Sequence, residues 1–365
     1  MGTRATNPMI PLPHFPAHPW LPERTVLYVV HGSRAYGTNR PDSDYDYRGI
    51  CVPPRHYRDG FAHVFEQAHT DVPDATVFEL RKFMGLCADC NPNVIEMLWV
   101  APEDRLLCTP AGQLLVQARA LFLSRKARYT FSGYALAQLK RIQNHHRWLR
   151  DPPKAQPNRA DFGLPERTAL PPDQLLAAEA AIRKQVDSWE LDLSGCDDAL
   201  RVHIHTQLDK ALLEMGLGNH QRYRAAGRLI GMDDNFLDLL DRERQYKQAR
   251  DNWRAYQVWQ NERNPARAAL EARHGYDTKH AMHLVRLLRM CREILVEGEV
   301  RVRRADAAEL LAIRDGAWEY ERLLAWAAEQ DAELGALERG SALPKAPDRE
   351  RLDQLCLAVT DAVGQ

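Results

Sequence analysis

The stretch VLYVVHGSRAYGTNRPDSDYDYRGICVPP, residues 26–54, carries the strongest structural signal of the chain. Its first residues are apolar and rich in β-branched and aromatic side chains, which predicts a buried strand over residues 25–31. The segment GSRAYGTNRP has the composition of a turn and a helix start, and residues 44–52 then alternate as a second strand does. The strand therefore leads directly into Gly-Ser, and two aspartates one residue apart follow.

Gly32 and Ser33 lie where the predicted strand passes into the predicted helix. At such a junction backbone N–H groups are free, and the positive end of the helix dipole faces outward. Glycine lets a phosphate come close to the backbone, and the hydroxyl of Ser33 adds a hydrogen-bond donor. This turn is expected to bind a triphosphate tail.

Asp44 and Asp46 are two residues apart on the second predicted strand, so their side chains are expected on one face. Two neighbouring carboxylates repel each other unless a cation lies between them. Magnesium or manganese, which prefer oxygen ligands, are the natural partners. Next to a phosphate-binding turn, this pair predicts phosphoryl or nucleotidyl transfer.

The rest of the chain predicts an α+β protein, with a small mixed-sheet core followed by a mostly helical body. Residues 74–80 (DATVFEL) predict a third strand, and from residue 81 onward apolar residues recur with helical spacing. The predicted divisions are a flexible N-terminal tail (1–24), a nucleotidyltransferase core (25–120), a basic helix (121–150), a proline-rich linker or loop (151–173) and a helical domain completing the nucleotide and acceptor cleft (174–365).

Composition narrows the class of protein. The formal net charge of the 365 residues is -1, so no global excess of charge points to nucleic acid or to a membrane. Seven scattered cysteines fit a reducing compartment better than a disulfide framework. Because the N-terminal segment has no long apolar core, we expect a cytoplasmic protein with no membrane partner.

Gly32-Ser33 followed by Asp44-x-Asp46 resembles the signature of the DNA polymerase beta-type nucleotidyltransferase superfamily. The longer string HGSRAYGTNRPDSDYDYRGICVPP resembles, more narrowly, the predicted nucleotidyltransferases associated with bacterial RNA-repair pathways. Later segments resemble the same family: VFELRKFMGLCADCNPNVIEMLWV, FLSRKARYTFSGYALAQLKRI, GYDTKHAMHLVRLLRMCREIL and ELLAIRDGAWEYERLL.

The resemblance implies two magnesium ions held by Asp44, Asp46 and a third carboxylate. An acceptor oxygen would attack the α-phosphate of a nucleoside triphosphate, and pyrophosphate would leave. The family pattern places the third carboxylate at Asp74, at the start of the third predicted strand. Asp71 and Glu79 remain alternatives.

Nucleotide-binding residues are expected on two segments. Arg34 is expected to turn either toward the phosphates or toward the acceptor. On the later segment the side chains fall at i, i+4 and i+7 of one helix face, for which a solvated basic face is the alternative. The expected nucleotide-binding residues are Gly32, Ser33, Arg34, Ser43, Lys279, His283 and Arg286.

Residues 124–150 contain many basic residues and no acidic one, a composition that favours a polyanion. A solvated basic helix compensated by distant acids is the alternative. The predicted acceptor-binding residues are Tyr134, Gln138, Lys140 and Arg141, and RNA is the preferred acceptor. A protein side chain or a small molecule as acceptor, or a binding module without catalysis, remain alternatives.

Overall fold

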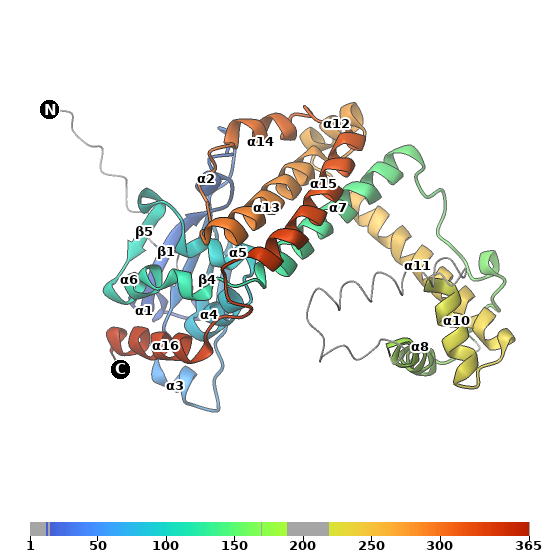
Figure 1. The fold of residues 1–365 in the computed structure, drawn as a ribbon, viewed down its shortest axis with the longest axis horizontal. Helices are drawn as coiled ribbons and strands as arrows, with labels where there is room; N and C mark the ends of the chain where they lie inside the picture. Colours follow the sequence, from blue (N-terminus) through green and yellow to red (C-terminus); the bar gives the residue numbers. More distant parts are fainter. Residues whose placement is uncertain (1–11, 14, 169, 188–218, 365) are drawn as a thin grey trace. The chain divides into compact units, whose positions relative to one another are not determined.

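The computed structural model describes residues 12–364 except for residues 14, 169 and 188–218. The chain divides into two compact units (Figure 1). The first combines residues up to 151 with residues from 264 onward, and the second comprises residues 152–263. This division corrects the predicted helical domain 174–365, because its last hundred residues pack with the N-terminal core.

A mixed sheet of five strands, in the order β3-β4-β2-β1-β5, forms the centre of the first unit. Strands β1 and β2 are antiparallel, as are β1 and β5 and also β3 and β4, whereas β2 and β4 are parallel. The strands are β1 (Thr25–His31), β2 (Asp46–Cys51), β3 (Gln67–Asp71), β4 (Asp74–Glu79) and β5 (Arg105–Cys108). The predicted α+β fold is thus confirmed.

The sequence predicts the central strands better than the outer ones. All residues of β1 are buried, since this strand has a neighbour on each side, and its apolar run follows from that burial. Strand β3 is a polar edge strand and β5 has four residues, so neither gives a clear pattern. Strand β2 begins only at Asp46, which places Asp44 in the preceding loop instead of on the strand.

Helices cover the sheet and form a bundle beside it, in which α7, α13 and α15 lie side by side (Figure 1). Helix α13 packs mainly on α7, and this contact joins the C-terminal segment to the N-terminal core. The longer helices of this unit are α4 (Leu80–Ala88), α6 (Pro110–Gln117), α7 (Ala127–Arg150), α12 (Pro265–His274), α13 (Thr278–Glu297), α14 (Ala307–Arg314), α15 (Tyr320–Gly340) and α16 (Arg349–Val363). The short ones are α1 (Leu21–Arg24), α2 (Gly32–Tyr36), α3 (Arg55–Arg58), α5 (Pro92–Ile95), η1 (Glu96–Leu98), η2 (Pro102–Asp104) and η3 (Arg119–Phe122).

The described part of the second unit is helical. Its core includes Ile182, Ala226 and Leu237, which come from three helices. Glu243 of helix α11 (Asp234–Glu262) accepts hydrogen bonds from Arg159 at 3.0 Å and Thr168 at 3.3 Å, so the predicted proline-rich linker or loop is bound to this helix. The elements are η4 (Ala160–Phe162), α8 (Pro172–Asp187), α10 (Asn219–Leu229) and α11 (Asp234–Glu262).

The N-terminal segment is also more ordered than predicted. Residues 1–11 of the predicted tail lie outside the described part. Phe15 and Leu21, however, are buried against Cys51, Phe65 and Val77 at the sheet. Apolar side chains in this proline-rich stretch therefore complete a small core of their own.

A buried ion pair joins the bundle to the sheet. The side chain of Glu96 is 0% exposed, and its carboxylate accepts hydrogen bonds from Arg286 Nη1 at 2.7 Å and from the Tyr36 hydroxyl at 2.6 Å. The Arg286 guanidinium lies 4.0 Å from the centroid of the Tyr36 ring. Burial lowers the pKa of His31, 3.7 Å from Glu96, to about 4, so its ring is neutral and the pair is balanced.

Replacing Glu96 by Gln should lower the free energy of unfolding by about 3–5 kcal/mol, because Arg286 would stay buried without a counter-charge. Urea unfolding followed by circular dichroism measures this loss. The control is Glu333→Gln, whose carboxylate pairs with the half-exposed Arg292 at 3.1 Å and should contribute at most about 1 kcal/mol. Equal losses in both variants would contradict a special role for the buried pair.

Candidate functional site

A cleft of about 890 Å³ opens in the first unit, where the end of β1 and the start of β2 face α7, α12, α13 and α14. Its volume lies within the range of about 300–1,000 Å³ that is typical of ligand sites. It brings together these predicted residues: Gly32, Ser33, Ser43, Asp44, Asp46, Tyr134, Gln138, Arg141, Lys279, His283 and Arg286. Three predicted residues, Arg34, Asp74 and Lys140, are not among those that line it.

The turn at Gly32 requires glycine for two reasons. Its φ is +67°, in the left-handed region that side chains with a Cβ rarely adopt. A Cβ at this position would also overlap Oδ2 of Asp46. Helix α2 has only five residues, so its dipole is small, and the turn offers mainly backbone N–H groups and the Ser33 hydroxyl. The Gly32 turn and the Asp46 carboxylate are thus in direct contact.

Asp46 starts β2, and Asp74 is its register partner at the start of the parallel strand β4. Burial raises the pKa of Asp46, and the charges of Asp74 and, to a lesser extent, Asp44 raise it further. Carboxylates that converge in this way become stable as anions when a divalent cation lies between them. The donor set therefore fits magnesium or manganese.

The structure separates the candidates for the third carboxylate. Asp74 adjoins Asp46, whereas Asp71 is on the far side of Asp74, on edge strand β3, where it contacts His69. Glu79 lies at the other end of β4 and caps α4 by accepting a hydrogen bond from the Lys82 backbone N–H at 2.8 Å. The geometry therefore favours Asp74.

Two arginines hold these carboxylates and their loop in place. Arg48 Nη1 donates to Asp74 Oδ1 at 2.9 Å. Arg34 donates to the backbone carbonyls of Ser43 at 2.6 Å and Asp44 at 3.3 Å, and lies 3.7 Å from the centroid of the Tyr45 ring. In this conformation Arg34 supports the loop that carries Asp44, instead of pointing to phosphates or acceptor.

The predicted stripe on α13 reaches the cleft, but its members differ in charge. Arg286 is paired with the buried glutamate on η1. Burial lowers the pKa of His283 well below its ordinary value, so the ring is neutral. Lys279 is exposed, and partial loss of water together with the charges of Arg267 and Arg314 lowers its pKa. Lys279 is thus the member of the stripe that offers an available amine.

Other cations around the cleft are harder to predict. Arg314, at the end of α14, lines the cleft, and it lies in the segment ELLAIRDG that resembles the family. Within the described part of the chain, Arg141, Lys279 and Arg314 make no side-chain hydrogen bond or ion pair. Lys140, next to Arg141 on α7, is exposed and lies outside the cleft lining. The cleft thus offers three uncommitted cationic groups.

Residues 16–150 match the RNA repair pathway DNA polymerase beta family. The resemblance to polymerase beta-type nucleotidyltransferases is therefore confirmed for the sheet and α7. The match ends where α7 ends, so it does not include the cleft residues on α12, α13 and α14.

Two curated proteins are similar to this chain. Uncharacterized protein YcgL of Bacillus subtilis (strain 168) is 26% identical over an alignment of 215 residues, and the match covers 51% of this chain and 80% of that protein. An uncharacterized 38.9 kDa protein of Enterobacteria phage T4, from the nrdC-mobD intergenic region, is 31% identical over an alignment of 90 residues, and the match covers 22% of this chain and 27% of that protein. No solved structure matches the chain significantly. None of the described helices combines the length and hydropathy that a membrane span needs.

A cluster of ionisable groups lies around Arg267, which itself lines the cleft. His145 Nδ1 lies 3.2 Å from Asp277 and 3.4 Å from Glu271, and Arg267 donates to the same Asp277 oxygen at 2.9 Å. Burial lowers the pKa of His145, but the hydrogen bonds to the two carboxylates outweigh this effect and raise it overall. The cluster joins α7 to α12 and to the start of α13, where Asp277 is the N-cap. With His145 protonated, two positive groups, His145 and Arg267, balance the two carboxylates.

Replacing Gly32 by Ala should abolish transfer activity and destabilise the protein by at least about 1 kcal/mol, because the new Cβ meets Asp46 in a left-handed backbone. Gly133→Ala is the control. It lies inside α7, where an added Cβ would meet nothing within 4 Å, and should stabilise the protein by about 0.5–1 kcal/mol. Thermal unfolding and a transfer assay measure both effects. A fully active Gly32→Ala would mean that the turn does not approach phosphate.

Stability should fall as pH rises above about 6.5, the ordinary pKa of histidine. A raised folded-state pKa contributes stability that is complete below the unfolded pKa and is lost as pH rises through the folded pKa. Burial lowers the pKa of the neighbouring His280 to about 4, so this residue does not change its charge between pH 6 and 9. The measurement is urea unfolding between pH 6 and 9 for wild type and His145→Gln, which should flatten the slope. His69→Gln, at the exposed sheet edge, should keep the slope, and an unchanged slope in His145→Gln would contradict the assignment.

Proposed function

We propose that this protein is a metal-dependent nucleotidyltransferase that moves a nucleoside monophosphate from a nucleoside triphosphate to an acceptor hydroxyl, with an RNA end as the favoured acceptor. Pyrophosphate is the second product. The observation that carries the proposal is the contact between the Gly32 turn and Asp46, with Asp74 in register beside it. A turn suited to phosphate and a carboxylate suited to a metal ion thus meet in the cleft, and a second carboxylate lies next to the first on the neighbouring strand.

Each group then has a role that follows from its position. Asp44, Asp46 and Asp74 would hold magnesium or manganese, two ions in all. These ions would neutralise charge on the phosphates and lower the pKa of the attacking hydroxyl. The backbone N–H groups at Gly32 and the Ser33 hydroxyl bind phosphate oxygens.

The remaining groups would neutralise the charge of the nucleoside triphosphate and align it for transfer. Lys279 on α13 and Arg314 on α14, which also line the cleft, offset the negative charge of the triphosphate tail. Transfer at an α-phosphate depends mainly on alignment and charge neutralisation, which the fixed carboxylates and cations supply. The neutral ring of His283 offers hydrogen bonds to sugar or base and adds no charge.

RNA is favoured as acceptor for two reasons. The residues that resemble the RNA repair family include α7, and this helix presents Tyr134, Gln138 and Arg141 to the cleft. Arg141 is exposed and uncommitted among the described residues, and the Tyr134 ring offers a face on which a base can stack. A protein side chain or a small molecule as acceptor would use the same carboxylates without needing these groups.

Incubation with each labelled nucleoside triphosphate, magnesium and cellular RNA or whole lysate tests the proposal. We expect RNA to take up label and pyrophosphate to appear. Asp46→Asn should reduce transfer by at least about 10³-fold and keep the fold, because the amide is shape-matched but cannot replace an anionic metal ligand. Label in protein or in small molecules would identify one of these as the acceptor in place of RNA, and a fully active Asp46→Asn would contradict the metal site.

Arg141 and Lys140 are neighbours on α7, and only Arg141 lines the cleft. Comparing variants of the two distinguishes an effect of position from an effect of charge alone. Arg141→Gln should raise the Michaelis constant for RNA and reduce the slope of log affinity against log salt by about one, because one phosphate contact is lost. Lys140→Gln removes the same charge outside the cleft and should change neither quantity much. RNA affinity across a salt series measures both. Identical curves for wild type and Arg141→Gln would point to a small acceptor.

A further inference from the structure

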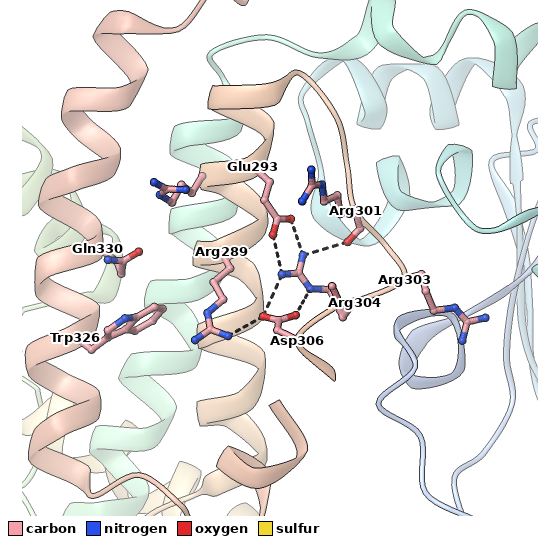
Figure 2. Close-up of a pocket in the computed structure, with 10 residues that line it drawn as sticks. Arg289, Glu293, Arg301, Arg303, Arg304, Asp306, Trp326 and Gln330 are labelled. Atoms are coloured by element: carbon pink, nitrogen blue, oxygen red, sulfur yellow. Dashed lines mark hydrogen bonds and ion pairs between the residues drawn. The ribbon is translucent and has the colours of Figure 1, made fainter. Parts of the chain in front are cut away.

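A second cavity, of about 370 Å³, lies in the first unit and shares no lining residue with the cleft. It is formed by the second half of α13, the segment 301–306 and α15 (Figure 2). Its charged lining consists of five arginines and two acids, so the lining itself is positive. The residues used below are Arg289, Arg292, Glu293, Arg301, Arg304, Asp306 and Trp326.

The inner part of this arginine pocket is a fixed scaffold. Arg304, with a side chain 4% exposed, donates to both oxygens of Glu293 at 2.6 and 2.8 Å and to Asp306 at 2.8 Å (Figure 2). Arg289 donates to Asp306 and to Glu309, each at 2.7 Å. Two guanidiniums are thus bound by three carboxylates, and the bidentate pair of Arg304 with Glu293 holds the floor of the pocket rigid.

The rim offers arginines that are less committed. Arg292 and Arg301 are 49% and 54% exposed, and each pairs with a surface glutamate, Glu333 and Glu297. Exposed pairs of this kind are weak and screened by salt. A phosphate dianion forms stronger, bidentate bonds with guanidinium groups, so it can take these arginines from their carboxylates.

Trp326 places a flat apolar surface beside these cations. The ring is half-buried in the pocket lining, and the Arg289 guanidinium lies 5.8 Å from its centroid. A tryptophan next to arginines suits a ligand that combines phosphate with a base, since bases stack on aromatic rings with little regard to sequence.

We propose that the arginine pocket binds one phosphorylated nucleotide, with the phosphate at Arg292 and Arg301 and the base against Trp326. The same chemistry is offered by a free mononucleotide and by one nucleotide of an RNA strand. The site lies outside the catalytic cleft, so it does not depend on the proposed transfer reaction. It is connected to the phosphate-binding helix, because the Arg304 backbone N–H donates to the Tyr36 carbonyl of α2 at 3.0 Å.

The test is calorimetric titration without divalent metal, using inorganic phosphate, AMP and a short 5′-phosphorylated RNA as probes. Arg292→Gln combined with Arg301→Gln should weaken binding at least about tenfold. The control, Arg339→Gln combined with Arg349→Gln, removes the same charge from exposed positions outside the pocket and should bind as wild type. If this double variant loses affinity for AMP, the ligand is a free nucleotide. If it loses affinity for RNA alone, the ligand is a nucleotide within an RNA strand.

Two further variants keep the proposal testable if the double variant folds poorly. Glu333→Gln releases Arg292 and should tighten AMP binding about threefold, whereas Trp326→Leu should weaken AMP and leave inorganic phosphate unchanged. Arg141→Gln combined with Lys279→Gln removes two of the three uncommitted cations of the cleft and should keep the pocket's affinity. No binding by wild type, or binding lost only in the cleft variant, would overturn the proposal.

Discussion

The buried carboxylate of Glu96 is the point on which the first unit depends. It bonds Tyr36 of α2 and Arg286 of α13, two residues 250 positions apart in the sequence, and it adjoins the end of β1. Replacing such a network by apolar residues is often harmless to stability in other proteins, so stability alone does not explain it. Its directional bonds fix the distance between α2, which begins at the Gly32 turn, and helix α13, which carries Lys279. The proposed transfer, which would depend on alignment, requires that kind of fixed distance.

Features that depend on neighbouring residues in the sequence are predicted well, whereas features that depend on contacts between distant segments are missed. The run TVLYVVH predicts a buried strand, because a central strand is apolar on both faces, and GS with DSD predicts the polar end of the cleft. Strand β3 gives no signal, because a solvent-facing edge strand keeps polar side chains. The family pattern points to Asp74, and only the parallel register of β2 and β4 brings it beside Asp46.

The same distinction applies to charge. Lys279, His283 and Arg286 share a helix face, and the spacing predicts three similar groups. Burial makes them different: one neutral ring, one paired guanidinium and one accessible amine. The division into units is equally hidden, because no local pattern reveals that α13 packs against α7 while the chain between them forms a compact unit of its own.

That discontinuity has a consequence for synthesis on the ribosome. Asp46 and the Gly32 turn leave the ribosome early, whereas Lys279 and Arg314 are added only after residues 152–263 have been made. N-terminal segments generally fold first during synthesis. Glu96 therefore has no Arg286 to pair with until α13 has been made. A nascent chain that has not yet reached α13 and α14 also lacks Lys279 and Arg314, so the cleft gains these two cations only late in synthesis.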